Sequence, residues 1–349
     1  MSKTNSGNFF ENFHVGQILH HATPKTVTAG DVALYGGLFG ARFAVQSSDD
    51  FARSLGYPTA PVDDLLCFHI VFGKTVADIS LNAVANLGYA DCRFLMPVYP
   101  GDTLYATSQI IGLKQNSNGK TGIVYVRSKG FNQHNDCVLD YVRWVMVRKK
   151  DPASPAPETV VPDLPAVIAP KDLTQLPEGV NCSGYNIGLS GSVHMWGDYS
   201  VGEKIDHVDG MTIEEVDHMM AARAFQNTAR VHFDQFQAAK GRFKRRLVYG
   251  GHIISLARAL SFNGLANAWA VAGINAGKHV SPCFAGDTIY AWSEVLEKAN
   301  MPLRDDVGLM RVRTFGVKDR PTADFPGEIQ ENYSPNVVLD IDYWVVMPR

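Results

Sequence analysis

One segment in the second half of the chain carries side chains that could move a proton. Residues 225–232 read FQNTARVH and place Asn227 close to His232. Residues 39–46, at the corresponding place in the first half, read FGARFAVQ, so Ala41 and Gln46 stand where this pair would be. Histidine accepts and returns protons near neutral pH, whereas alanine and glutamine do not. A lone histidine is more often structural, but the difference between the halves favours His232 as a proton-transfer residue.

A glycine pair lies a little further along the second half. Residues 249–252 read YGGH and open an apolar stretch that predicts a helix over 252–265. A backbone N–H at a helix start can stabilise a developing oxyanion, because it is already aimed and is aided by the helix dipole. The alternative is a simple glycine turn before a helix. The first half has Asp63 and Asp64 here, whose charges would repel an oxyanion.

An internal repeat relates the two halves. Residues 97–106 (PVYPGDTLYA) return as 282–291 (PCFAGDTIYA), with an offset of 287 − 102 = 185 between the two aspartates. FHVG at 13–16 is echoed by YSVG at 199–202, and VLD at 138–140 returns at 338–340. Two copies at so long a period indicate a duplicated domain. Prolines crowd the stretch between them, which predicts repeats over 1–150 and 173–349 joined by an extended linker over 151–172.

The same order of elements is predicted in each repeat. Thr28 to Asp31 and Thr212 to Glu215 both fit the Thr-x-x-acid pattern of a helix start. Longer apolar helices follow over 65–79 and 252–265, and strand-like runs such as 122–127 and 338–347 come later. We therefore expect an α+β fold in which each repeat wraps an antiparallel sheet around one central helix. The two sheets would pair as an internal pseudo-dimer.

The composition narrows the class of protein. The net charge of −3 gives no reason to expect nucleic acid or an anionic membrane as a partner, and no apolar run reaches transmembrane length. The five cysteines are scattered and form no CxxC pair, which is typical of reduced thiols in a cytoplasmic protein. No His, Cys or carboxylate spacing suggests a zinc site, so we expect no metal.

The layout resembles the MaoC-like (R)-specific enoyl-CoA hydratase family, whose members have a hotdog fold. The family motif is Gly-Asp-x-Asn-Pro-x-His, followed by Asp and Ala two and six residues after the His. The second repeat matches it at His232, Asp234 and Ala238, but Asn227 stands where the family has its catalytic Asp. Residues 39–48, 63–89, 226–233 and 249–267 are similar in detail to members that hydrate mesaconyl-CoA.

The resemblance implies a double hotdog that reversibly adds water to a 2-enoyl-CoA thioester, most simply mesaconyl-CoA. It implies a CoA-thioester substrate, no cofactor and further self-association. His232 would then be the acid and base, and the Gly251 N–H would hold the thioester oxygen. Asn227 cannot be a general base. Either it orients the water for His232, or the carboxylate of the substrate does the work of the missing Asp.

The resemblance also suggests where the substrate would bind. A carboxylate is best paired by arginine, and the candidates are Arg230, Arg93 and Arg42. Contact with the acyl thioester is expected beside the helix start, at Tyr249, Gly250 and His252, while His69 is expected to be a core residue. A basic cluster could hold the phosphates of CoA, although such a run is usually a solvated face: Arg242, Lys244, Arg245 and Arg246.

Two rival functions fit the same layout. A hotdog thioesterase usually needs a carboxylate to activate water against the thioester, and Asn227 argues against it. A non-catalytic acyl-CoA-binding protein would fit if both repeats had lost their chemistry, and His232 argues against that.

Overall fold

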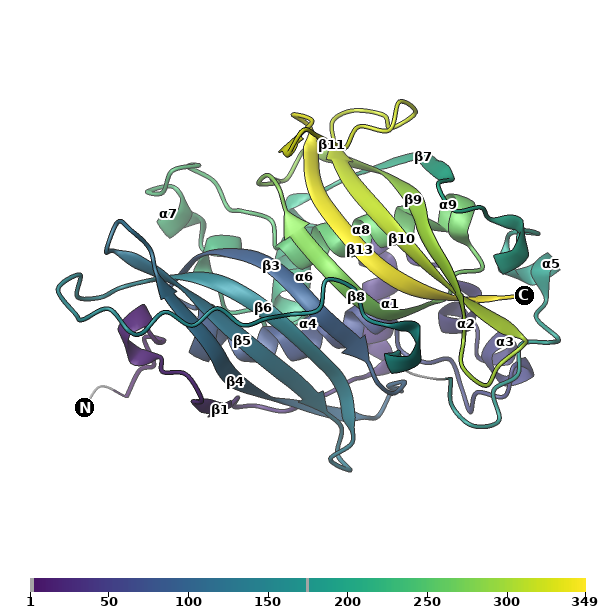
Figure 1. Ribbon diagram of the computed structural model, residues 1–349, viewed down its shortest axis with the longest axis horizontal. Coiled ribbons are helices and arrows are strands. Elements are labelled where there is room, and N and C mark those ends of the chain that lie inside the picture. The colour runs from purple at the N-terminus through teal and green to yellow at the C-terminus, as the bar shows by residue number, and fades with distance from the viewer. Residues whose placement is uncertain (1–2, 174–175) are drawn as a thin grey trace.

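One antiparallel sheet runs through both repeats in the computed structural model, which describes residues 3–173 and 176–349 (Figure 1). The first repeat contributes, in spatial order, β1 (Ile18–His20), β4 (Thr103–Gln115), β5 (Thr121–Phe131), β6 (Cys137–Arg148) and β3 (Ala83–Phe94), with β2 (Lys25–Thr26) paired to β4. The second contributes β8 (Ala270–His279), β13 (Val337–Pro348), β10 (Val307–Lys318), β9 (Thr288–Asn300) and β7 (Lys204–Thr212). The halves join where Tyr89 of β3 lies opposite Gly277 of β8. The predicted pairing of the two sheets is confirmed.

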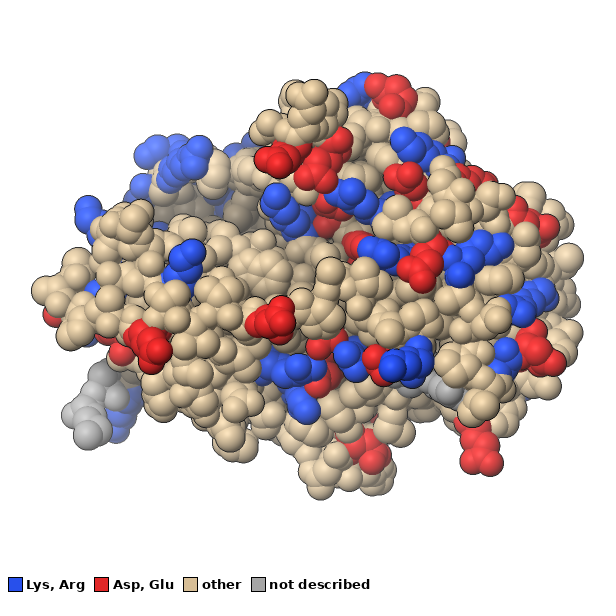
Figure 2. Space-filling model, viewed as in Figure 1, with Lys and Arg blue, Asp and Glu red and all other residues tan. Residues whose placement is uncertain are grey.

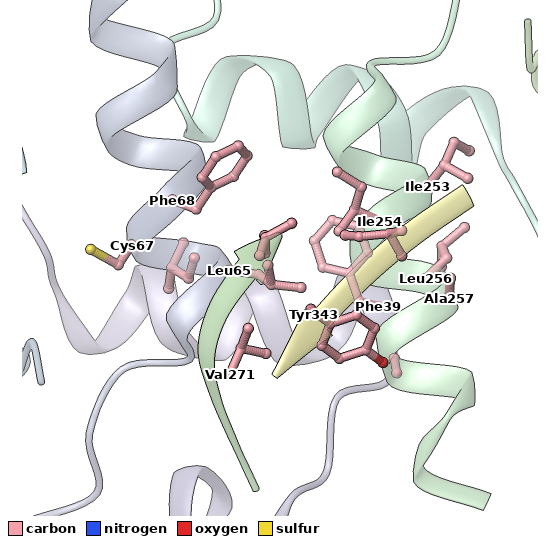
Figure 3. Packing of buried hydrophobic residues seen from close by; sticks show 14 of the residues in the cluster. Phe39, Leu65, Cys67, Phe68, Ile253, Ile254, Leu256, Ala257, Val271 and Tyr343 are labelled. Atoms are coloured by element: carbon pink, nitrogen blue, oxygen red, sulfur yellow. The ribbon is translucent and has the colours of Figure 1, made fainter. Parts of the chain in front are cut away.

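Two buried helices lie on the inner side of the sheet. They are α4 (Asp64–Thr75), continued by the π-helical turn η2 (Val76–Ser80), and α8 (Gly250–Leu260), followed by α9 (Phe262–Leu265). Every residue of α4 after Asp64 and of α8 after Gly250 is buried, which explains why both sequences are apolar on nearly every face. Leu65 and Phe68 face Ile254 across the space between the helices (Figure 3). The predicted central helices are confirmed to within two residues at their starts.

A peripheral helix precedes the central helix in each repeat, α1 (Ala29–Phe39) in the first and α6 (Glu215–Ala224) in the second. The remaining elements are short: η1 (Phe10–Asn12), α2 (Ala44–Ser47), α3 (Asp49–Ser54), η3 (Pro170–Asp172), α5 (Ile187–Ser190), η4 (Trp196–Asp198), η5 (Arg230–His232), α7 (Gln235–Ala238), β11 (Glu328–Ile329) and β12 (Asn332–Tyr333).

The predicted helix start is correct at Thr28 and wrong at Thr212. Thr28 Oγ1 accepts a hydrogen bond from the Asp31 N–H at 3.1 Å, and the Asp31 carboxylate accepts one from the Thr28 N–H at 2.9 Å. Thr212 is still in β7, where its hydroxyl bonds Thr288 at 2.8 Å, and the N-cap of α6 is Glu214. The sheet pairing of Thr212 holds its backbone extended, which moves the helix start two residues along the chain.

The linker over 151–172 is extended and packs against both repeats. Val160 exchanges backbone hydrogen bonds with Leu113 of β4, at 2.8 and 2.9 Å. Ile168 is buried, its N–H donates to Asn275 Oδ1 at 2.9 Å, and its carbonyl accepts the Trp344 indole N–H at 3.1 Å. The segment is therefore docked along its length and does not act as a free tether.

A buried polar network occurs once in each repeat and supports their equivalence. His21 Nε2 bonds Ser108 Oγ at 2.7 Å, and Ser108 bonds Ser128 at 2.7 Å. In the second repeat His207 bonds Ser293 at 2.8 Å, and Ser293 bonds Thr314 at 2.7 Å. These positions are 207 − 21 = 186, 293 − 108 = 185 and 314 − 128 = 186 residues apart. The same offsets therefore identify equivalent residues elsewhere in the two repeats.

Gly73, near the end of α4, lies directly against the backbone of the second repeat. A Cβ on this glycine would lie 1.8 Å from the Phe225 carbonyl oxygen, at the end of α6. Phe225 also stacks on His69 of α4, with ring centroids 4.7 Å apart. The path of the chain after α6 is thus fixed by a helix of the other repeat.

We expect Gly73→Ala to lower the free energy of unfolding by about 2–3 kcal/mol or more, because the new methyl group meets backbone that cannot yield. Gly37→Ala is the matched control. It is also a helical glycine, but its Cβ would meet open space, so a gain of up to about 1 kcal/mol is expected. Urea denaturation of the two variants measures both effects, and equal midpoints would contradict the proposed contact.

Candidate active site

His232 is held in one tautomer by a backbone carbonyl. It ends the 3₁₀ turn η5, and its Nδ1 lies 2.8 Å from the Leu247 carbonyl oxygen. A carbonyl can only accept, so Nδ1 carries the proton and Nε2 keeps a free lone pair. The ring stands 5.8 Å from that of Tyr249, between centroids. Nε2 of His232 therefore remains available to accept a proton.

The protonation state of His232 also suits a base. Burial lowers its pKa to about 4, and the bond to the Leu247 carbonyl opposes this shift only in part. Burial disfavours the charged imidazolium. The ring is therefore neutral at pH 7 and able to take a proton.

Asn227 uses its amide oxygen to hold its own turn. The side chain is buried, and Oδ1 accepts the Ala229 N–H at 3.0 Å. The Asn227 N–H in turn donates to the Ala222 carbonyl at 2.9 Å, which ties the residue to α6. Because an N–H donor identifies its partner as the oxygen, the group left for a ligand is the NH₂ donor. Asn227 can thus hold an oxygen atom but cannot accept a proton.

The start of α8 leaves N–H groups without a cap. Tyr249 is the N-cap and makes no side-chain capping bond, and the first N–H groups of a helix have no partner within it. A Cβ on Gly251 would lie 2.4 Å from the Tyr249 ring, and one on Gly250 would lie 2.5 Å from the His279 ring. Both positions therefore need glycine, which lets these two rings lie directly against the helix start.

In the first repeat a side chain caps the helix start that is equivalent to that of α8. Leu65 corresponds to Gly251 at the offset of 186, and its N–H is taken by Asp63 Oδ1 at 2.9 Å. Asp64 accepts the Val271 N–H at 2.8 Å, and burial raises its pKa to about 7. Gln46 uses its amide nitrogen to bond the Trp269 carbonyl at 2.9 Å. These groups of the first repeat serve the fold.

The structure also places the two histidines of the central helices. His252 is buried with its ring 4.8 Å from that of Phe39 between centroids, and burial lowers its pKa to about 3. Its ring packs in the core against α1. His69 bonds Ser255 Oγ at 2.7 Å and lies 3.4 Å from the Tyr249 hydroxyl. His69 is a buried core residue, as predicted, and it supports Tyr249.

His279 is a neighbour of the site that the sequence reading missed. Its ring lies against Gly250, and its Nε2 is 3.2 Å from the Tyr89 hydroxyl. Burial lowers its pKa to about 4, and the nearby His232 adds to the shift. The equivalent residue in the first repeat is Phe94, at the offset of 185. Comparing the two repeats at every position, and not only within the motif, would have revealed this change.

The three arginines considered for a substrate carboxylate do not meet at the site. Arg230 is exposed. Arg93 pairs with Asp91 at 2.8 Å. Arg42 is exposed and lies over the Phe262 ring, 4.5 Å from its centroid. Arg230, two residues from His232, therefore stays a candidate for the carboxylate, while Arg93 and Arg42 are held by other groups.

The basic cluster lies on the surface close to His232. Lys and Arg side chains gather over the loop that follows α7 (Figure 2), and Arg242, Lys244 and Arg245 are exposed. Arg246 instead pairs with Glu215. The loop leads straight into Leu247, whose carbonyl holds His232 and whose N–H donates to Val231 at 3.0 Å. A polyanion bound here would thus lie beside the segment that holds His232.

Two searches of the described residues gave no candidates. No cluster of three or more His, Cys, Asp or Glu side chains in this part of the chain could hold a metal ion. No helix within it is long and apolar enough to cross a membrane.

The chain matches proteins of known name over its whole length. The sequence model of the mesaconyl-CoA hydratase family matches residues 1–327. A β-methylmalyl-CoA dehydratase from Chloroflexus aurantiacus is 63% identical and covers 100% of this chain and 99% of its own. A mesaconyl-CoA hydratase from Cereibacter sphaeroides is 56% identical, covering 99% of this chain and 100% of its own.

Solved structures agree with the fold. A crystal structure of a MaoC domain protein dehydratase from Chloroflexus aurantiacus has a TM-score of 0.97 at 63% identity, covering 100% of this chain and 99% of that one. A Mycobacterium tuberculosis protein described as having a double hotdog fold has a TM-score of 0.77 at 23% identity over 99% of both chains. The double hotdog expected from the sequence is confirmed.

We expect His232 to stay neutral with its proton on Nδ1 until the pH falls to about 4. An ordinary histidine is half protonated near pH 6.5, and burial moves His232 below that value. NMR titration of protein labelled with ¹⁵N-histidine, with His232→Gln to assign the signal, measures the midpoint and the tautomer. A midpoint near 6.5, or a proton on Nε2 in the neutral form, would contradict this geometry.

Proposed function

Because the chain belongs to the mesaconyl-CoA hydratase family, we propose that it reversibly adds water to mesaconyl-CoA to give β-methylmalyl-CoA. It is a hydro-lyase that acts on a CoA thioester. The observation that carries the site assignment is the contrast between the repeats. The second repeat keeps a neutral histidine near an uncapped helix start, and the first has neither.

In the proposed mechanism His232 moves one proton. Its Nε2 takes a proton from water as the water oxygen bonds to the β-carbon, and the electrons of the double bond move toward the thioester oxygen. The Gly251 N–H and the positive end of the α8 dipole hold the resulting enolate oxygen. His232 then returns the proton to the α-carbon. The growing negative charge favours the imidazolium form, which offsets the low pKa of the free site.

Asn227 is proposed to position the water by donating from its NH₂ group. Its oxygen is already committed to the Ala229 N–H. This role differs from that of the Asp in the family motif, which could accept a proton. His232 is then the proton-transfer residue for both steps.

The exposed part of the basic cluster is proposed to bind the CoA phosphates. Arg242 and Lys244 have no carboxylate partner among the described residues. Arg245 lies over the Phe284 ring, with its guanidinium carbon Cζ 4.5 Å from the ring centroid. Arg246 is a weaker candidate, because Glu215 already pairs with it. A cytoplasmic location and assembly into a homo-oligomer stay predictions from the sequence.

Loss of the conjugated enoyl-thioester absorbance on mixing the protein with mesaconyl-CoA tests the activity. We expect His232→Gln to lower kcat by about 10²–10⁴-fold, because glutamine can still donate to Leu247 but cannot accept the proton. His134→Gln, at an exposed loop histidine, is the control and should leave kcat unchanged. Release of free thiol without loss of the enoyl band would instead identify a thioesterase.

A second variant separates the two explanations for the missing Asp. If Asn227 donates to the water, Asn227→Asp should slow mesaconyl-CoA and crotonyl-CoA by a similar factor, on the order of 10-fold or more, because the donor is lost. The measurement is the ratio of kcat/KM for the two substrates. A selective gain with crotonyl-CoA, which has no carboxylate, would mean that the substrate carboxylate does the work of the Asp.

A further inference from the structure

Arg143 of β6 is a buried guanidinium without a protein anion. Its side chain is 0% exposed. It donates to Thr75 Oγ1 at 2.8 Å and approaches Ser80 Oγ at 3.4 Å, while Nε has no partner. No carboxylate of residues 3–173 and 176–349 lies within ion-pairing distance of it. A buried charge is costly unless an opposite charge or full hydrogen bonding compensates it.

The other deeply buried arginine has such a compensation. Arg258 of α8 donates to the Ser261 hydroxyl at 3.2 Å and to the Ala268 carbonyl. Burial raises the pKa of the nearby Asp63, and the charge of Arg258 opposes that rise. Neither arginine has a carboxylate within ion-pairing distance among the described residues, but Arg258 acts on the charge of Asp63, whereas, apart from burial, only tyrosines act on the pKa of Arg143.

In the second repeat, the residue equivalent to Arg143 lines a cavity. VLD and a tryptophan repeat at an offset of 344 − 144 = 200 in β6 and β13, so Arg143 corresponds to Tyr343. The strand registers agree, because Arg143 lies opposite Tyr89 just as Tyr343 lies opposite Ile274. Tyr343 reaches in among the side chains of α4 and α8 (Figure 3). There it lines a small cavity of about 10 Å³, room for roughly one water molecule, beside Leu65 and Arg258.

The positions equivalent to this cavity lining lie around Arg143 and the start of α8. Leu65, at one end of the cavity, corresponds to Gly251, the proposed oxyanion position. The other lining residues correspond to seven side chains of the first repeat: Phe68, Val71, Phe72, Asn86, Tyr89, Ser128 and Tyr141. The side chains between the Gly251 N–H and Arg143 are therefore the equivalents of that cavity lining.

Contacts between named residues connect the guanidinium to the helix start. Arg143 lies over the Phe72 ring, 4.3 Å from its centroid, and the Phe72 and Tyr249 rings are 5.5 Å apart. Tyr89, the cross-strand neighbour of Arg143, bonds His279, which lies against Gly250. The phenol groups of Tyr89 and Tyr249 add hydrogen-bond donors to the same region.

We propose that Arg143 receives the carboxylate of the acyl group and selects dicarboxylic over monocarboxylic enoyl-CoA substrates. The proposal rests on the proposed function and names the residue that recognises its substrate. The guanidinium offers a planar pair of N–H donors that matches a carboxylate in a bidentate arrangement. Lys74 is the other buried cation in this region, but Gln226 already occupies its ammonium group.

The first test compares substrates. The full chain and Arg143→Met are assayed with mesaconyl-CoA and crotonyl-CoA, and the ratio of their kcat/KM values is the readout. Truncating one partner of a buried charge pair typically costs enough to change affinity by about 100-fold or more, so this ratio should fall by that factor. A general loss of structure would lower both substrates equally. Arg258→Met is the matched control and should leave the ratio unchanged.

The second test measures binding alone, so it does not depend on turnover. Succinyl-CoA and butyryl-CoA lack the double bond and differ mainly in the carboxylate. We expect the wild-type protein to bind succinyl-CoA more tightly than butyryl-CoA. Arg143→Met should bind the two thioesters with equal affinity. If that variant does not fold, as judged by its thermal unfolding, Arg143→Lys serves in its place and should keep part of the preference, because lysine offers a point charge without the fork.

The outcomes distinguish the two proposals. Wild-type protein that hydrates neither enoyl-CoA would contradict the proposed function, while the succinyl-CoA preference would still test Arg143. Wild-type protein that hydrates mesaconyl-CoA while Arg143→Met keeps the wild-type ratios would overturn the role of Arg143 alone. A wild-type protein with equal affinity for the two saturated thioesters would overturn it without any variant.

Discussion

The site depends on the contact between Gly73 and the Phe225 carbonyl, where a helix of one repeat touches the backbone of the other. A side chain at Gly73 would separate α4 from the end of α6. Immediately after Phe225 the chain turns through Gln226, which adopts a positive φ of 55° and is held by Lys74 of α4. Asn227 comes next. The segment that carries Asn227 and His232 thus belongs to the second repeat but takes its position from the first.

The two repeats therefore have different roles, which explains why the first repeat is still needed although it lacks the candidate catalytic residues. The second repeat supplies Asn227, His232 and the start of α8, and the first supplies the surface on which they rest. The loss also benefits the first repeat locally. An Asp N-cap stabilises a helix by about 1 kcal/mol, and Asp63 takes that benefit by bonding the Leu65 N–H. One N–H cannot both be capped and stay free for an oxyanion, so stability and chemistry exclude each other at this position.

The sequence predicted the parts of the structure that local patterns determine. The repeat, the two central helices and the pairing of the sheets follow from short motifs and apolar periodicity, and His232 follows from the difference between the repeats. Thr212 was misread because a capping pattern cannot show that its residue is still paired in a strand. His279 and Arg143 lie on strands far from the motif in the sequence. Only the register of β3, β6 and β8 brings them toward Gly250, and that register is a long-range property.

The same electrostatic demand accounts for Asn227 and for Arg143. Hydration builds a negative enolate, so a negative group at position 227 would oppose the reaction, and a dicarboxylic acyl group adds a carboxylate that needs a cation. Burial lowers the pKa values of His69, His232 and His279 and keeps these rings neutral at pH 7, so they supply no positive charge to the free site. Positive charge is then supplied by Arg143 and by the α8 dipole, at opposite ends of the acyl group. A carboxylate held by Arg143 is also a poorer base, which favours His232 over the substrate as the group that takes the proton from water.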